Sequence, residues 1–227
     1  ESYTKSNLVG FSNILEICRL KKSNLIFAST SSVYGDTSDF PISEKFSTDK
    51  PIQYYAATKK SNEVMAYSYS KLFNIKTVGL RFFTVYGPWG RPDMSLFKFT
   101  KNILLNKEIE VFNNGKHYRD FTYIDDIVSG IIKSINFINK NKKKENLFEI
   151  FNLGRGKSIS LKEFIKWTEL AIGKTAKKKY LEKQKGDIYK THCDIKKSKK
   201  LLGYNPKTNF ITGIKKFVSW YKKYYSI

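Results

Sequence analysis

A tyrosine and a lysine four residues apart could form an acid–base pair. Tyr55 and Lys59 open a stretch, residues 55–72, that contains neither glycine nor proline and is predicted to be a helix. Residues at i and i+4 share one helix face, so the Lys59 ammonium would lie near the Tyr55 phenol. A phenol ionises at about pH 10, and a neighbouring cation favours the phenolate. The pair could therefore accept a proton from a substrate hydroxyl, although the same spacing is common on ordinary surface helices.

Three consecutive hydroxyl groups form a second candidate cluster. Thr30, Ser31 and Ser32 follow a predicted buried strand at residues 25–28, and residues 81–88 follow the next predicted strand. In open α/β sheets, ligands bind outside the carboxyl ends of the strands. The hydroxyls could bind a sugar, or they could only cap the strand in a Ser/Thr turn. Together with the Tyr55 pair they predict a site at one edge of a sheet.

The elements that must position these residues alternate between helix and strand. Residues 3–20, 25–28, 55–72 and 76–82 read as helix, strand, helix and strand. Such alternation predicts an α/β protein whose parallel sheet is covered on both faces. The second half is more mixed. Its helices are predicted at residues 95–105, 125–137, 161–172 and 211–225, and its strands at residues 108–112, 121–124 and 148–153.

This pattern predicts two domains. Residues 1–90 would form an incomplete doubly wound, dinucleotide-binding (Rossmann) domain. Residues 91–227 would mainly form a smaller α/β substrate-binding domain, with some segments returning to the first sheet. The chain begins on a predicted helix and contains no Gly-rich phosphate-binding turn. We therefore expect a preceding segment on the order of 100 residues, in which the first βαβ units would lie.

Composition excludes several classes of protein. The 227-residue chain has 42 Lys and Arg against 20 Asp and Glu, a formal net charge of +22. Its lysine runs are short and lack interleaved aromatics, which argues against nucleic-acid binding and favours attraction of an anionic substrate. No run approaches the ~18 apolar residues of a membrane helix, and residues 1–10 lack a signal-peptide pattern. Cys18 and Cys193 lack metal-type spacing and are read as reduced thiols of a cytoplasmic protein.

The chain resembles the extended short-chain dehydrogenase/reductase family over nearly its whole length. The resembling segments are residues 27–35, 55–60, 80–94, 119–126 and 186–187, in the same order as in the family. Within that family, the UDP-glucuronate 4-epimerases match best. The resemblance implies NAD as cofactor, a UDP-sugar as substrate and no metal.

The family's roles carry over to matching positions. The resemblance implies that Tyr55 is the catalytic acid and base, that Thr30 hydrogen-bonds the sugar 4-hydroxyl, and that Lys59 binds the nicotinamide ribose. It implies cofactor contacts from Tyr55, Lys59 and Phe82. The implied substrate contacts are Ser31, Ser32, Thr84, Arg91, Phe112, Arg119 and Asp187.

Within this set, Arg119 would bind the diphosphate, Asp187 the uridine ribose, and Phe112 would lie near the uracil. The alternative for Arg119 is a local ion pair with Asp120. Asp125 and Asp126 begin a predicted helix and are expected to cap it. His117 and His192 match no partner pattern and are predicted to lie on the surface.

The resulting hypothesis is NAD-dependent epimerisation at C4 of a UDP-sugar, with conversion of UDP-glucuronate to UDP-galacturonate through a 4-keto intermediate as the expected reaction. A decarboxylase or 4,6-dehydratase of the same family, a basic binding module and an inactive fragment are the alternatives. We expect the chain alone to bind NAD weakly, because it lacks the Gly-rich turn. Relatives imply a homodimer through the helices at residues 3–20 and 55–72.

Overall fold

The computed structural model describes residues 1–184 and 186–227, which form two compact units. Unit 1 consists of residues 1–83, 128–153 and 193–205. Unit 2 consists of residues 84–127, 154–192 and 206–227. Neither unit is continuous in sequence. None of the helices among the described residues is both long and apolar enough to cross a membrane.

Unit 1 is built on a three-stranded parallel sheet. Its strands are β1 (Leu25–Thr30), β2 (Thr77–Phe82) and β7 (Phe148–Leu153), in the order β1-β2-β7. The central strand β2 is buried at every position except its last, as expected for a strand covered on both faces. The α/β fold with a parallel sheet predicted from the sequence is therefore confirmed.

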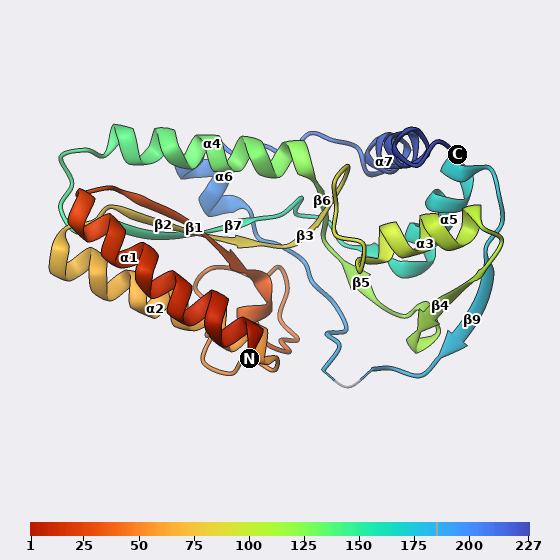
Figure 1. Cartoon of the computed structure of the whole chain (residues 1–227), viewed down its shortest axis with the longest axis horizontal. Coiled ribbons are helices and arrows are strands. Elements are labelled where there is room, and N and C mark those ends of the chain that lie inside the picture. The colour runs from red at the N-terminus through yellow and green to blue at the C-terminus, as the bar shows by residue number, and fades with distance from the viewer. Residues whose placement is uncertain (185) are drawn as a thin grey trace. The chain divides into compact units, whose positions relative to one another are not determined.

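Helices cover both faces of this sheet (Figure 1). One face carries α1 (Gly10–Lys21), which a π-helical turn (Thr4–Val9) precedes, and α2 (Tyr54–Phe73). The other face carries α4 (Ile124–Lys140), most of which lies in unit 1, and α6 (Lys196–Leu202). Leu15 and Cys18 of α1, Ala66 of α2 and Phe27 of β1 form a buried core between helices and sheet. This core holds α1 and α2 against the strand that ends in Thr30.

A long connection follows β1. It begins with a short 3-10 helix (Ser31–Tyr34) and ends where α2 begins. Val33, Tyr34 and Ile42 from this connection pack with Phe83 and Cys193 in a second small core. The first half of this connection is thus packed against the sheet unit.

Among the described residues, unit 2 contains three pairs of short strands, three whole helices and the first turn of α4. β3 (Thr84–Tyr86) pairs in parallel with β6 (Phe121–Tyr123), and β4 (Glu108–Phe112) with β9 (Lys177–Leu181). β5 (Tyr118–Arg119) pairs antiparallel with β8 (Ile159–Ser160). The helices are α3 (Ser95–Leu104), α5 (Leu161–Ile172) and α7 (Phe210–Tyr224), and a short 3-10 turn lies at Asn113–Gly115.

Aromatic side chains dominate the core of unit 2. The Phe121 ring stacks on Phe164 at a centroid distance of 4.6 Å, and the Phe210 ring lies 5.7 Å from Phe121. A capping box between Ser160 and Glu163 begins α5 by satisfying N–H groups that its first turn leaves without helical partners. This core fixes the strands and helices that line the cavity described below.

Most elements expected from the sequence are present. The predictions for residues 108–112, 148–153 and 161–172 agree with the bounds of β4, β7 and α5. The prediction for Asp126 was wrong: it does not cap its own helix. Its carboxylate accepts the backbone N–H groups of Lys207 and Thr208 at 3.0 and 3.1 Å. The Cys18 and Cys193 thiols are both buried.

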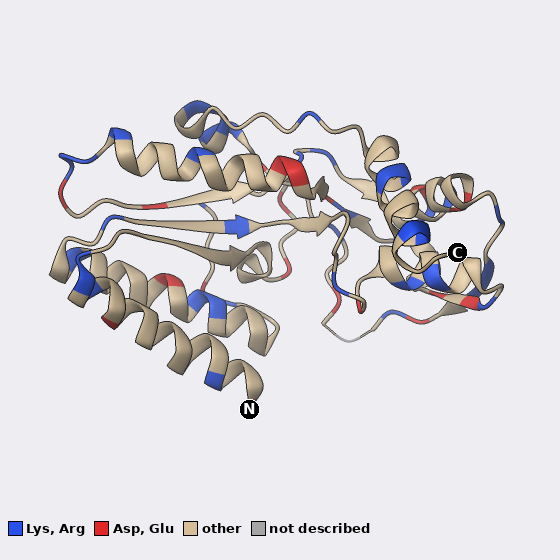
Figure 2. Ribbon diagram, turned by 45° about the horizontal axis from the view of Figure 1, so that its top comes forward, with Lys and Arg blue, Asp and Glu red and all other residues tan. Residues whose placement is uncertain are grey.

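Charged residues lie on many elements of the chain. Figure 2 shows lysines and arginines on helices and loops of both units, with the fewer acidic residues among them.

Candidate active site

The hydroxyl cluster of unit 1 lies at the carboxyl end of β1. Thr30 Oγ1 accepts the Ser32 backbone N–H at 3.2 Å and donates to Ser32 Oγ at 3.2 Å. Thr30 is 8% exposed, whereas Ser31 and Ser32 are half-buried. The turn-capping role considered from the sequence is therefore real, and the serine hydroxyls still reach the surface of the unit.

The helix that carries Tyr55 is attached to β1 just before this cluster. Lys59 Nζ donates to the carbonyl oxygen of Ala28 at 3.0 Å, and Glu63 Oε1 accepts the hydroxyl of Ser29 at 2.6 Å. The next residue in the strand is Thr30. Because Tyr55, Lys59 and Glu63 stand at i, i+4 and i+8, the helix face that carries Tyr55 is the face turned to β1.

Three more of the predicted site residues, Tyr55, Lys59 and Phe82, lie near this cluster. Tyr55 and Lys59 are half-buried, and burial lowers the pKa of the Lys59 ammonium below its usual value. Phe82, the last residue of β2, lies opposite Thr30 in the strand register. Unit 1 thus brings Thr30, Lys59 and Phe82 together on neighbouring elements.

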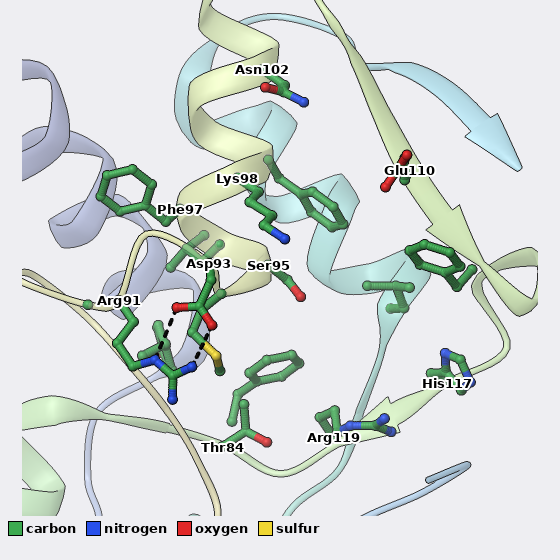
Figure 3. A pocket seen from close by; sticks show the side chains of 18 of the residues that line it. Thr84, Arg91, Asp93, Ser95, Phe97, Lys98, Asn102, Glu110, His117 and Arg119 are labelled. Atoms are coloured by element: carbon green, nitrogen blue, oxygen red, sulfur yellow. Dashed lines mark hydrogen bonds and ion pairs between the residues drawn. The ribbon is translucent and has the colours of Figure 1, made fainter. Parts of the chain in front are cut away.

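Unit 2 contains a cavity of about 810 Å³. All five of the substrate contacts expected in this unit line it, and Figure 3 shows Thr84, Arg91 and Arg119 among its side chains. The five are Thr84, Arg91, Phe112, Arg119 and Asp187. Charges of both signs line the same cavity, from Lys98 and Lys179 as well as Glu108 and Glu110.

Arg119 and Asp187 form an ion pair in this cavity. Arg119 Nη2 donates to Asp187 Oδ1 at 2.6 Å, and Arg119 Nη1 donates to the Tyr118 carbonyl at 3.0 Å. Burial lowers the pKa of the Arg119 guanidinium, and Asp187 opposes that shift. The local ion pair with Asp120 is absent, because Asp120 is buried and its carboxylate accepts the N–H groups of Arg155 and Gly156 at 2.7 and 2.9 Å.

His117 is a part of this cavity that the sequence prediction missed. The histidine is 5% exposed rather than on the surface, and its Nε2 lies 3.3 Å from Asp187 Oδ2. Its partner is 70 residues away in the chain, so no local pattern could reveal it. Burial lowers the pKa of His117, Arg119 and Lys183 lower it further, and Asp187 opposes them.

His192 is also not a plain surface residue. It is half-buried, and its Nε2 lies 3.1 Å from the carbonyl oxygen of Gly156.

Arg91 occupies a more open part of the cavity. Its Nε donates to Asp93 Oδ1 at 3.0 Å, its side chain is 70% exposed, and Figure 3 shows the pair side by side.

Lys98, from α3, was not among the predicted site residues; Figure 3 shows its side chain in the cavity. Lys98 could have been found only from its position on α3, since its sequence neighbours are typical of an amphipathic helix.

The arrangement separates two kinds of chemistry. Unit 1 offers a phenol, an ammonium and three hydroxyls, which can move a proton. Unit 2 offers a guanidinium, a carboxylate and the Phe112 ring, which can bind an anion, hydroxyls and a flat base.

Comparison with known proteins identifies the family of the chain. Residues 1–154 match the family described as "NAD dependent epimerase/dehydratase family". An uncharacterized protein of Methanocaldococcus jannaschii, MJ1055, is 51% identical over 221 residues, which cover 97% of this chain and 66% of that protein. UDP-glucuronate 4-epimerase 4 of Arabidopsis thaliana is 43% identical; the match covers 99% of this chain and 54% of the plant protein.

The fold also matches solved structures. A crystal structure of UDP-glucuronic acid 4-epimerase from Bacillus cereus, in complex with UDP-glucuronic acid and NAD, superposes with a TM-score of 0.89 at 35% identity. The match covers 98% of this chain and 69% of the Bacillus chain. This chain thus spans between about half and seven-tenths of these relatives. The chain belongs to the NAD-dependent epimerase/dehydratase family.

Proposed function

We propose that the protein interconverts UDP-glucuronate and UDP-galacturonate by NAD-dependent epimerisation at C4. The observation that carries the proposal is the attachment of the Tyr55 helix to β1. The Lys59–Ala28 and Glu63–Ser29 bonds hold the phenol-bearing face beside the strand that ends in Thr30. The Arabidopsis and Bacillus relatives, both UDP-glucuronate 4-epimerases by name, support this substrate.

Tyr55 removes the proton of the sugar 4-hydroxyl. It returns the proton after the 4-keto sugar has rotated to present its other face. Thr30 hydrogen-bonds the same oxygen and orients it. The Lys59 cation favours the ionised phenol. The Lys59–Ala28 bond holds the ammonium in place, so the cation need not be ordered during the reaction.

The residues of unit 1 fit a nicotinamide cofactor. An ammonium has three N–H donors, so the bond from Lys59 to Ala28 leaves capacity for ribose hydroxyls. Tyr55 and Phe82 would complete these contacts. NAD⁺, when bound, supplies the redox chemistry at C4, and the protein supplies position and proton transfer.

The cavity of unit 2 would bind the nucleotide. Arg119 presents a planar fork that suits the diphosphate, and Asp187 can accept hydrogen bonds from the uridine ribose. Phe112 would pack on the uracil, and Thr84 and Arg91 would contact the sugar side. In unit 1, Ser31 and Ser32 would bind the glucuronate carboxylate and so oppose loss of CO₂ from the keto sugar.

The test is turnover of UDP-glucuronate by the full-length protein with NAD⁺, with the two UDP-uronates separated by chromatography. Formation of UDP-galacturonate from UDP-glucuronate, and the reverse reaction, is the expected result. Release of labelled CO₂ would indicate a decarboxylase instead. Turnover of a different UDP-sugar with none of UDP-glucuronate would reject the substrate.

We also propose that the protein dimerises through α1 and α2. Large apolar side chains on these two helices are exposed, including Ile17 at 53% and Leu72 at 71%. A patch of this kind on packed helices is typical of an interface between identical subunits. The other exposed side chains of the patch are Ile14, Leu20, Val64, Tyr67 and Phe73, and Val9 lies directly before α1.

The proposal includes a cellular setting. Two buried thiols suit a reducing compartment, which supports the cytoplasm as the site of the reaction. A UDP-uronate product is an activated sugar, so enzymes that build polysaccharides are the class that would consume it.

A further inference from the structure

We infer that the buried Glu63–Arg81 pair is a positioning device that holds the hydroxyl segment Thr30–Tyr34 against the helix of Tyr55 and Lys59. The inference rests on the proposed function for its catalytic consequence. Glu63 and Arg81 would not touch the sugar or the cofactor. They would act through Ser29 and Tyr34.

The pair is fully formed and almost completely buried. Arg81, in the central strand β2, is 5% exposed, and Glu63, in α2, is 4% exposed. Arg81 Nε donates to Glu63 Oε1 at 2.8 Å, and Arg81 Nη2 donates to Glu63 Oε2 at 2.7 Å. Two parallel charge-assisted bonds fix the direction of both side chains, and therefore fix α2 relative to the sheet.

The same two charged groups hold both ends of the hydroxyl segment. At its start, Ser29 donates to Glu63 Oε1 at 2.6 Å. At its end, Arg81 Nη1 donates to the hydroxyl of Tyr34 at 2.9 Å, and the guanidinium carbon lies 4.8 Å from the centre of the Tyr34 ring. Thr30, Ser31 and Ser32 lie between these two fixed points.

The network continues into the third strand of the sheet. Tyr34 donates its hydroxyl hydrogen to Asn152 Oδ1 at 2.7 Å, and Asn152 Nδ2 donates to the carbonyl of Ile42 at 2.9 Å. The Asn152 backbone N–H donates to Glu44 at 2.8 Å. Polar contacts therefore tie the segment that follows β1 to α2, β2 and β7, in addition to its apolar packing with Phe83 and Cys193.

A buried ion pair is a weak source of stability, because removing two charges from water costs free energy that apolar residues would not require. It does fix the orientation of the side chains that it joins, since each hydrogen bond has a preferred angle and length. Proton transfer needs that orientation: the two heavy atoms must lie within about 2.6–3.2 Å of each other. A misplacement of about 1 Å can reduce a rate by ~100-fold.

The position of Glu63 in the chain agrees with this role. Tyr55, Lys59 and Glu63 occupy successive turns of one helix face. One surface of α2 therefore carries the proposed base, the cation beside it and the carboxylate that attaches the helix to β1 and β2. Glu63 bonds the residue directly before Thr30, and Lys59 bonds the residue before that.

The experiment compares four variants of the full-length protein with the unmodified protein. Ser29→Ala and Tyr34→Phe each remove one attachment and leave the pair intact, so they should fold. Glu63→Gln replaces one charge by an amide of similar shape. Lys197→Gln is the matched control, because it breaks a different ion pair of unit 1, Lys197–Glu149, whose side chains are 31% and 24% exposed.

The first measurement is amide hydrogen exchange, which needs no turnover. The Ser32 and Gly35 amides donate to Thr30 Oγ1 and to the Ser32 carbonyl within the segment. Ser29→Ala, Tyr34→Phe and Glu63→Gln should accelerate exchange over residues 30–35 and leave α1 and the carboxyl half of α2 unchanged. The control should change none of these amides. Unchanged exchange over residues 30–35, or equal acceleration throughout unit 1, would overturn the inference.

The second measurement separates kcat from KM for the UDP-sugar. We expect kcat to fall ~10-fold or more in Ser29→Ala and Tyr34→Phe, because Thr30 orients the oxygen that loses the proton. KM should change less, within ~3-fold, since Ser31 and Ser32 contact only the sugar carboxylate and the nucleotide cavity of unit 2 is unaltered. Local acceleration of exchange with an unchanged kcat would overturn the catalytic part. An unmodified protein without epimerase activity would reject the proposed function, while the exchange data would still decide whether the pair holds the segment.

Discussion

Arg119 and Asp187, 68 residues apart in the chain, are joined by a hydrogen bond of 2.6 Å inside the cavity of unit 2. Arg119, the cation expected to bind the diphosphate, and Asp187, the anion expected to bind the ribose, therefore already neutralise each other. In the proposed site, an entering nucleotide would exchange part of this contact for its own phosphate and hydroxyl groups. Affinity then depends on how much better the fork of Arg119 fits phosphate than carboxylate.

The first prediction concerns the two arginines of the cavity. Arg119→Gln should weaken UDP binding by ~10- to 100-fold, since a hydrogen bond to a charged group contributes about 1.5–3 kcal/mol. Arg91→Gln should cost less, because the Arg91 side chain is 70% exposed and pairs with Asp93 in solvent. Titration calorimetry with UDP measures both losses. Equal losses for the two variants would contradict the assignment of the diphosphate to Arg119.

The second prediction concerns pH. The pKa of His117 lies below its usual value of 6.5, chiefly because the ring is buried, so the folded protein keeps His117 neutral where the unfolded chain is already protonated. As pH falls through about 6.5, the unfolded state binds the extra proton first, and the free energy of unfolding decreases. The loss continues until the pH reaches the lower, folded pKa.

His117→Gln removes this proton uptake. Its free energy of unfolding should fall less than that of the unmodified protein between about pH 7.5 and pH 5. Urea unfolding at several pH values measures the two slopes. Parallel slopes would show that His117 titrates alike in both states, against the buried placement beside Asp187.

The third prediction tests the proposed base. Tyr55→Phe should reduce turnover by ~10²- to 10⁴-fold, the usual contribution of a general acid–base group, and leave UDP affinity unchanged. Tyr54→Phe is the matched control: Tyr54 is 57% exposed, and its hydroxyl lies 2.6 Å from that of Thr4. A Tyr55→Phe protein with near-normal kcat would remove Tyr55 from the chemistry.

The fourth prediction tests the proposed dimer. Ile17→Glu places a charge in the apolar patch of α1 and α2, and should convert the dimer to monomers in sedimentation experiments. Leu170→Glu, at a 60% exposed position on α5, should leave the dimer intact. The same sedimentation behaviour for both variants would place the interface elsewhere.

Strong local patterns predicted the elements of this fold well. The strand at residues 148–153 and the helix at residues 161–172 have clear apolar periodicity and bounded ends, and both were predicted with their observed bounds. β9 was missed because Lys177, Lys178 and Lys179 resemble a solvated loop. That strand exists because it pairs with β4, a tertiary contact that local propensity does not contain.

The candidate site shows the same division. The hydroxyl cluster at Thr30 could be predicted from residue type, and the Tyr55–Lys59 pair could be predicted from the period of a helix. The burial of His117 and the Glu63–Arg81 pair could not, because each depends on partners brought together by the fold. Charge pairs across long sequence separations leave no periodic signal in a single chain.

The interleaving of the two units has a consequence for evolution and for protein engineering. The chain changes unit at five places, after residues 83, 127, 153, 192 and 205. A gene cut at any one of these places never releases a whole unit: the cuts after residues 83 and 205 release only a fragment of unit 1 or of unit 2, and the other three cuts give products that each carry parts of both units. Neither unit can therefore be expressed or exchanged as one continuous segment of the chain. Exchange of a whole unit with a relative would need several simultaneous cuts rather than one.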